Sequence, residues 1–213
     1  MQLEIGRYNK GGGNMSHDSS RYLMYTDGGC YNNGDRKGDG SYAYLLVDKE
    51  NTKYVDVRCE YVENTTNNRM EMLAVLEGIK WVDDNDPNIH VDIDIVSDSG
   101  YLVKGWTDPS YLDRWMSNGW KTSTGKPVQN RDMWTELNRL SWTVGINFTH
   151  IRGHKKDRNK DHAFWNDICD RACTWMLQEF RQPGFIVTLR YDFKSKSFEQ
   201  IKCELVERSN DNG

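Results

Sequence analysis

Apolar and polar residues alternate over short stretches in the first hundred positions, which predicts strands. Such stretches lie at residues 22–26, 42–48, 53–62 and 91–97, and turn-forming residues separate the first two. Asp27-Gly28-Gly29 is expected to end the first strand, and the polar residues at 48–51 are typical of a hairpin turn. The chain is therefore predicted to open as an antiparallel meander.

The pattern then changes to helical spacing. Apolar residues three or four positions apart predict a helix over residues 68–82, and further helices are expected at 132–143 and 163–179, on either side of a strand at 146–151. A meander followed by helical crossovers predicts an α/β fold with a mixed five-stranded sheet flanked by helices. Functional sites in such sheets form beyond the strand ends, where Asp27 and Asp98 are expected.

After Gln182-Pro183-Gly184, alternation resumes at 185–191 and 198–206 and predicts a β-hairpin. An isolated hairpin is only marginally stable, so it must pack on the main domain or on a partner. We divide the chain into a flexible glycine-rich tail (1–20), one catalytic domain (21–181) and a C-terminal extension with a frayed end (182–213). We expect a monomer, with a dimer or partner contact through the hairpin as the alternative.

Composition narrows the class of protein. A chain of 213 residues with 37% hydrophobic content can bury one core, and its apolar runs are far too short to cross a membrane. No secretory signal pattern is found at the N-terminus, and the five cysteines lack disulfide-framework spacing, so we place the protein in the cytoplasm. The net charge of −4 does not exclude nucleic acid as a partner, because binding depends on where the cations lie. A local basic stretch runs from Arg152 to Lys160.

Four acids in separate segments carry the candidate chemistry: Asp27, Glu71, Asp98 and Asp170. Clustered carboxylates suit hard divalent cations such as Mg²⁺, and two such ions can promote phosphodiester hydrolysis. The sequence therefore predicts a metal-dependent nuclease. Taken singly, each acid also has a structural explanation: a turn for Asp27, a helix-start acid for Glu71, a cap for Asp98 and a solvated helix face for Asp170.

A possible zinc site and a group of tryptophans could also have functional roles. Zinc could be held by some of His150, His154, His162, Cys169 and Cys173, but their spacing matches no common zinc motif, and small buried cysteines are the better explanation. The tryptophans at 106, 115, 120 and 134 could stack on bases, although packing of a small helical subdomain is preferred.

Several motifs, in this order, resemble type 1 ribonuclease H over about residues 20–180. They are Tyr25-Thr26-Asp27-Gly28, Thr65-Thr66-Asn67-Asn68-Arg69-Met70-Glu71, Ser97-Asp98-Ser99 with Tyr101, Gly119-Trp120-Lys121-Thr122, Lys126-Pro127-Val128, Asp132-Met133-Trp134, Arg152-Gly153-His154, and Asn166 through Asp170. The resemblance implies that the four acids hold two Mg²⁺ ions, with Mn²⁺ as a substitute. It also implies that His154 assists proton transfer or product departure.

The resemblance further implies contacts with an RNA–DNA hybrid. Asn33 and Asn67 would lie along its minor groove, where 2′-hydroxyls identify RNA, and Thr66 and Arg69 would hold a phosphate of the DNA strand. Thr66 and Asn67 could equally be helix caps. Residues 106–134 resemble the family's protruding handle, but consecutive cations after Trp115 are missing, which leaves Lys121 among the few basic contacts there. We hypothesise that cations in the loop after His154 replace the positive charge that the handle lacks.

The predicted activity is endonucleolytic hydrolysis of the RNA strand of RNA–DNA hybrids, giving 5′-phosphate and 3′-hydroxyl ends. A noncatalytic nucleic-acid-binding module with the same fold is the alternative. A nuclease that also accepts double-stranded RNA or DNA is the third possibility.

Overall fold

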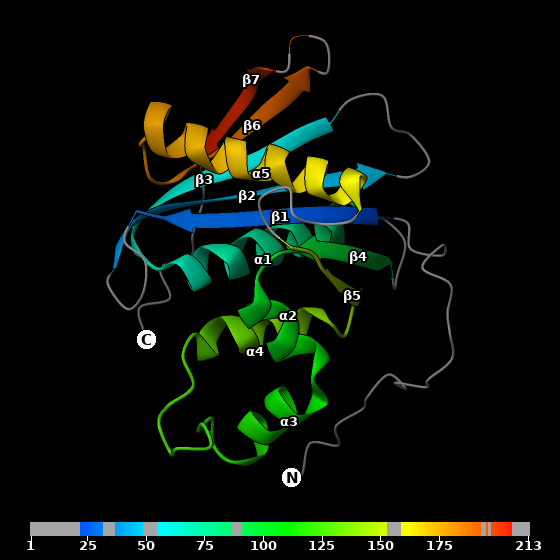
Figure 1. The fold of residues 1–213 in the computed structure, drawn as a ribbon, viewed down its shortest axis with the longest axis vertical. Coiled ribbons are helices and arrows are strands. Elements are labelled where there is room, and N and C mark those ends of the chain that lie inside the picture. The colour runs from blue at the N-terminus through cyan, green and yellow to red at the C-terminus, as the bar shows by residue number, and fades with distance from the viewer. Residues whose placement is uncertain are drawn as a thin grey trace.

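The computed structural model describes residues 22–31, 37–48, 55–86, 91–152, 159–192, 195 and 197–205. Across these ranges the chain forms one seven-stranded sheet in the order β5-β4-β1-β2-β3-β6-β7 (Figure 1). The helices are α1 (Asn67–Asn85), α2 (Gly100–Thr107), α3 (Pro109–Ser117), α4 (Arg131–Leu140) and α5 (Lys160–Glu179). None of the helices in these ranges is long and apolar enough to cross a membrane.

The predicted meander and crossovers are confirmed. Strands β1 (Tyr22–Cys30), β2 (Gly38–Asp48) and β3 (Val55–Thr65) pair antiparallel. After helical connections, β4 (Asp92–Ser97) pairs parallel with β1, and β5 (Gly145–His150) pairs parallel with β4. The sheet is therefore mixed, with its parallel part around β1, β4 and β5.

The expected strand count is wrong, because the C-terminal hairpin joins the main sheet. Strand β6 (Phe185–Asp192) pairs antiparallel with β3, and β7 (Ser197–Leu205) pairs with β6. Without β6, the outer backbone groups of β3 would lack partners and Val57 would lose its cross-strand neighbour Leu189. The hairpin covers this edge and becomes buried itself, since Val187 and Leu189 have no exposed surface.

The expected end of the first strand is also wrong. Strand β1 continues to Cys30, because the residues from Asp27 onward pair with β2 from Ala43 to Gly40. Its parallel pairing with β4, however, stops at the Tyr25–Val96 pair. Asp27 therefore lies just beyond the parallel region, where the topology places functional sites.

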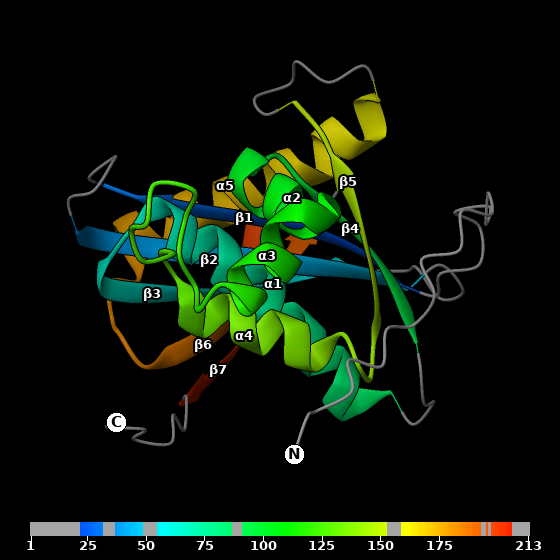
Figure 2. The ribbon, with the colours of Figure 1, turned by 90° about the horizontal axis from the view of Figure 1, so that it is seen from below.

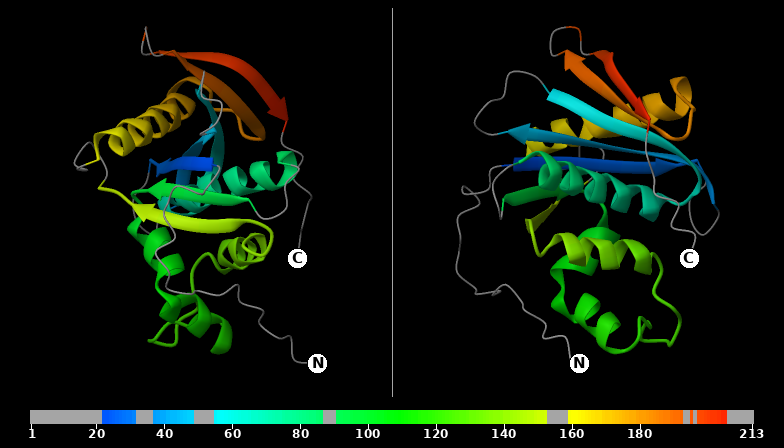
Figure 3. Two further views of the ribbon diagram at one scale, coloured as in Figure 1. Left: turned by 90° about the vertical axis from the view of Figure 1, so that its right-hand side faces the viewer. Right: turned by 180° about the vertical axis from the view of Figure 1, so that it is seen from behind.

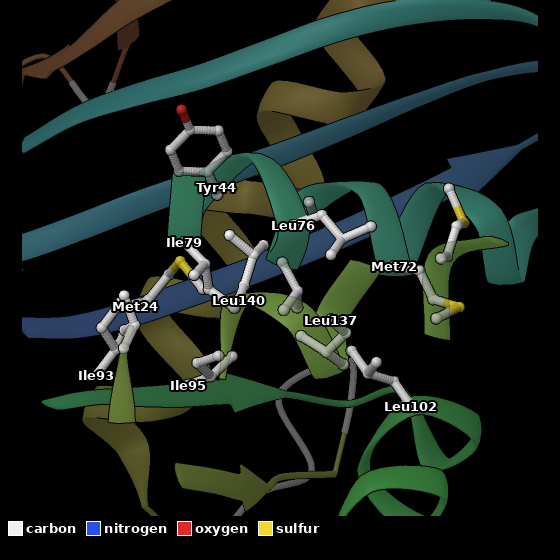
Figure 4. Packing of buried hydrophobic residues seen from close by; sticks show 14 of the residues in the cluster. Met24, Tyr44, Met72, Leu76, Ile79, Ile93, Ile95, Leu102, Leu137 and Leu140 are labelled. Carbon is white, nitrogen blue, oxygen red and sulfur yellow. The ribbon is translucent and has the colours of Figure 1, made fainter. Parts of the chain in front are cut away.

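Side-chain alternation divides the core into two layers. Met24 and Tyr44 point to the face covered by α1 and α4 (Figure 4), whereas Tyr25 and Leu45 point to the face covered by α5. Figure 3 shows α1 and α5 on opposite sides of the sheet. This arrangement holds both helices rigidly beside β1.

Helices α2 and α3 and the segment leading to α4, where a handle is expected, gather at one end of the molecule in Figure 1 and lie in front of the sheet in Figure 2. Trp134 is fully buried, its indole N–H donates to the Tyr101 hydroxyl over 2.9 Å, and its ring lies 5.6 Å from that of Trp115. Trp106 and Trp120 pack partly buried against the same core. These tryptophans stabilise the helical subdomain, as preferred from the sequence.

Candidate active site

All four predicted acids line one pocket of about 360 Å³ where β1, α1, α5 and the end of β4 meet. Asp27 comes from β1, Glu71 from α1, Asp98 from the residue after β4, and Asp170 from α5. Each acid is partly exposed. Four segments that are distant in the sequence thus bring their carboxylates to a single solvent-accessible hollow.

Asp27 sits in a setting that disfavours its charge. Burial raises the pKa of Asp27 well above its usual range, and the nearby carboxylates of Asp98, Asp170 and Glu71 raise it further. The backbone N–H of Gly28 donates to Asp27 Oδ1 over 2.9 Å and partly opposes this shift. The ionised form of Asp27 is therefore the form that a bound cation would stabilise.

Gly28 allows α1 to approach β1 closely. A Cβ atom at position 28 would overlap the backbone of Met70 and Glu71 and would lie 2.8 Å from the Met70 Cβ. Only glycine leaves this space open. The missing side chain therefore permits the first turn of α1 to place Glu71 beside Asp27.

Two hydrogen bonds orient Glu71. Asn67 Nδ2 donates to Glu71 Oε1 over 3.0 Å, and the Ser99 hydroxyl donates to Glu71 Oε2 in a short hydrogen bond. Burial raises the pKa of Glu71 to about 7, Asp98 adds to this rise, and the Ser99 hydrogen bond opposes it. Glu71 is thus held in place by groups that also favour its ionised form.

Asp98 and Asp170 complete the ring of acids. Asp98 lies between two buried serines, and the second of these, Ser99, caps α2 by accepting from the Leu102 N–H over 3.3 Å. Asp170 shares one face of α5 with Asn166, Asp167 and Leu177, all of which line the pocket. The pocket therefore follows the length of α5.

The donor chemistry fits a hard divalent cation, because the four converging groups are carboxylates that repel one another. Burial is the main cause of the raised pKa of Asp27, and this repulsion adds to it. In the described part of the chain, no group of three or more His, Cys, Asp or Glu side chains is yet arranged to hold an ion. The acids would have to turn toward a cation as it binds.

The zinc interpretation finds no support among the described residues. Cys169 and Cys173 are buried, and their thiols donate to the carbonyl oxygens of Tyr25 and Asp27 over 3.4 and 3.5 Å. Burial raises the pKa of both thiols, which disfavours the thiolate that zinc requires. His162 Nδ1 lies 2.8 Å from the Tyr25 hydroxyl.

The predicted substrate contacts are only partly assembled around the pocket. Asn67 lines it, whereas Thr66, Arg69 and Lys121 are not among its lining residues. Thr66 is the N-cap of α1 but makes no side-chain capping bond. Arg69 forms two hydrogen bonds, of 3.2 and 2.8 Å, to Asp132 on α4.

Lys121 lies exposed in the handle, where its backbone N–H donates to Asn118 Oδ1 over 3.0 Å. Asn33 and His154 lie outside the described residues. Their predicted roles therefore stay predictions.

Two residues that support the site have no role assigned from the sequence. Ser99 does not line the pocket but orients Glu71, which does. Asn166 lines the pocket, and its buried Oδ1 has no hydrogen-bond partner. Its position four residues before Asp170, on the same helical face, was the available signal.

Comparison with known proteins agrees with this architecture. The sequence model of the RNase H family matches residues 19–176. A ribonuclease H of Thermoanaerobacter sp. (strain X514) is 33% identical over 164 residues, which cover 77% of this chain and 94% of that protein. A ribonuclease H of Acetivibrio thermocellus is 34% identical over 151 residues, covering 71% of this chain and 90% of that protein.

Solved structures show the same fold. LC9-RNase H1, described as a type 1 RNase H with the type 2 active-site motif, has a TM-score of 0.59 at 21% identity, covering 73% of this chain and 71% of that one. A foamy viral protease-reverse transcriptase in complex with an RNA/DNA hybrid has a TM-score of 0.57 at 18% identity, covering 73% of this chain and 20% of that one. Because the family model and the curated relatives span most of its length, this chain belongs to the ribonuclease H family.

Proposed function

We propose that this ribonuclease H is an endonuclease that hydrolyses the RNA strand of RNA–DNA hybrids with the help of two Mg²⁺ ions, for which Mn²⁺ can substitute. The observation that carries the proposal is the meeting of four carboxylates from four elements in one pocket. The related viral enzyme solved with an RNA/DNA hybrid supports the choice of substrate. The chain would act in the cytoplasm.

Each acid has a part in this proposal. Asp27, Glu71, Asp98 and Asp170 would hold the ions, and bound Mg²⁺ supplies an activated water and stabilises the departing oxygen. Asn67 and Ser99 keep Glu71 turned toward the pocket through their hydrogen bonds. The expected products carry 5′-phosphate and 3′-hydroxyl ends.

The substrate contacts that we propose come from several segments of the chain, of which Asn67 lines the pocket. Asn67 would meet the RNA minor groove with Asn33, while Thr66 and Arg69 would hold a phosphate of the DNA strand. To do so, Arg69 would have to leave Asp132, its present partner. Lys121 would contact the hybrid from the handle, and His154 would assist proton transfer or product departure.

A cleavage assay tests the proposal directly. Labelled RNA in a hybrid is incubated with the protein and Mg²⁺ or a chelator, beside duplexes of RNA and of DNA. We expect metal-dependent cutting of the RNA in the hybrid only, with 5′-phosphate ends. Failure to cut any duplex would instead favour the noncatalytic binding module, and equal cutting of all three would contradict hybrid specificity.

Asp98→Asn sharpens the test, because an amide is a poorer cation ligand of nearly the same shape. We expect cleavage to fall by at least about 100-fold, with hybrid binding and the melting temperature nearly retained. Asp92→Asn is the matched control, since Asp92 is exposed at the other end of β4. Full activity of the Asp98 variant would remove Asp98 from the site.

A further inference from the structure

The second half of β7 presents exposed apolar side chains at an edge of the sheet. Leu205 is 69% exposed and Ile201 is 40% exposed, and Cys203 between them is also exposed. Strand β7 is the last strand on this side of the sheet among the residues that the structure describes (Figure 3). Its outer backbone groups are therefore available to another strand.

The first half of β7 differs at one residue, because a side chain of α5 packs on Phe198, whose side chain is partly buried. The Phe198 ring packs 5.4 Å from that of Tyr191, and the Arg171 guanidinium of α5 lies 5.6 Å from the Phe198 ring centre. A β-bulge separates the two halves. Thr188 of β6 pairs with Lys202, but Leu189 pairs with Gln200, so Ile201 is the extra residue of the bulge. The exposed apolar side chains of β7 thus lie within residues 201–205.

We propose that residues 201–205 of β7 pair antiparallel with the same residues of a second copy of this chain. The two-fold axis passes through Cys203, so that Cys203 lies opposite the partner's Cys203. In this register Ile201 lies opposite the partner's Leu205, and Lys202 lies opposite the partner's Glu204. Apolar residues then meet apolar residues, and opposite charges meet, on both sides of the axis.

The charges of Lys202 and Glu204 favour a second copy of this chain as the partner, and they favour the register centred on Cys203. Shifting the axis by one residue would place Lys202 opposite the partner's Lys202 or Glu204 opposite the partner's Glu204, and like charges directly opposite are destabilising. Lys202 Nζ already lies 2.7 Å from Glu204 Oε1 in the same strand. A strand that complements itself about one residue is suited to an isologous two-fold contact.

This dimer leaves the active site free. The pocket lies among β1, β4, α1 and α5, whereas β2, β3 and β6 separate β1 from β7. Two copies would therefore share one continuous sheet and keep both pockets open. Because a single strand pair buries little surface, we expect a reversible dimer with a dissociation constant roughly in the micromolar range.

Sedimentation measurements over a concentration series test the proposal with charge reversals. We expect Lys202→Glu and Glu204→Lys each to raise the dimer dissociation constant by at least about tenfold. The double variant restores opposite charges and is expected to recover dimerisation. Asp84→Lys, an exposed position on α1, is the matched control and should leave association unchanged. A monomeric wild type, or a double variant as weak as the single ones, would overturn the proposal.

Mild oxidation tests the register. Opposed cysteines in an antiparallel pair lie within disulfide distance, so we expect a covalent dimer from the wild type and none from Cys203→Ser. A wild-type protein that dimerises in sedimentation but forms no cross-link on oxidation would overturn the register, whereas Cys203→Ser should still form the non-covalent dimer. Cleavage per chain by the charge variants verifies that they are folded, since neither residue lies near the pocket.

Discussion

Asp27 illustrates, at the scale of a single residue, how a carboxylate proposed to bind a cation can oppose stability. Its carboxylate is held in a buried site beside three other acids, which raises its pKa. We predict that Asp27→Asn stabilises the metal-free protein by roughly 1–3 kcal/mol, or about 3–10 °C in melting temperature, while cleavage is lost. Melting in chelator and a hybrid cleavage assay check both effects.

The control for this change is Asp83→Asn, which neutralises an exposed acid on α1. We expect it to alter neither quantity appreciably. A metal-free Asp27 variant that melts below the wild type would show that the carboxylate makes favourable contacts outweighing its repulsion.

The raised pKa of Glu71 predicts that the stability of the metal-free protein depends on pH. Its pKa is raised in the folded protein from 4.5 to about 7, so the unfolded chain loses this proton first as the pH rises. The protonated carboxyl group of Glu71 therefore contributes stability at low pH. This contribution is lost as the pH rises through the pKa that Glu71 has in the folded protein. In chelator, the free energy of unfolding should fall between about pH 4.5 and 7.

Glu71→Gln should flatten this fall, because glutamine has no proton to lose. Urea unfolding in chelator across this pH range measures the effect, with the exposed Glu63→Gln on β3 as control. Asp27 also has a raised pKa, so part of the slope should remain. Parallel curves for the wild type and the Glu71 variant would contradict the prediction.

At this scale the sequence singles out the four acids that meet in the pocket, but not the groups that orient them. Asp27, Glu71, Asp98 and Asp170 each lie in a distinctive local motif. The contact of Ser99 with Glu71 joins residues 28 positions apart and depends on how α1 packs beside β4. Such a partnership is decided by tertiary structure, which no local pattern contains.

At the scale of elements, the contact of α1 with β1 depends on one missing methyl group. Gly28→Ala would force a Cβ into the backbone of α1. We predict a loss of roughly 1–3 kcal/mol in stability and a larger relative loss of activity, because Glu71 would move from Asp27. Thermal melting and kcat measurements test this.

Gly29 supplies a matched control. A Cβ added at position 29 meets nothing within 4 Å, so Gly29→Ala should retain nearly all of the stability. Equal losses for the two variants would mean that glycine acts through chain flexibility and not through the close approach of α1.

The positions of most elements were predictable, whereas their ends and edges were not. Helix α1 was expected at 68–82 and spans Asn67–Asn85, because its apolar face repeats regularly. The extension of β1 through two glycines depends on pairing with β2, and pairing partners lie outside any local window. Local propensity favoured a turn there, and the sheet overrode it.

At the scale of the molecule, the C-terminal hairpin supports the sheet. Ending the chain after Gln182 would expose the edge of β3 and remove Val187, Leu189 and Tyr191 from the core. Since each buried apolar side chain contributes about 1.5–3 kcal/mol, we predict a melting temperature lower by more than about 10 °C, or aggregation. Calorimetry and light scattering measure these outcomes, and an unchanged melting temperature would show that the hairpin is dispensable.

The order of the segments also affects when the enzyme becomes active. Cys173 on α5 donates to the carbonyl oxygen of Asp27 across 146 positions, so β1 and α5 meet only after nearly the whole domain exists. A nascent polypeptide whose α5 has not yet emerged from the ribosome lacks Asp170 and half of its pocket wall. The pocket is therefore completed only once α5 has emerged and packed against β1.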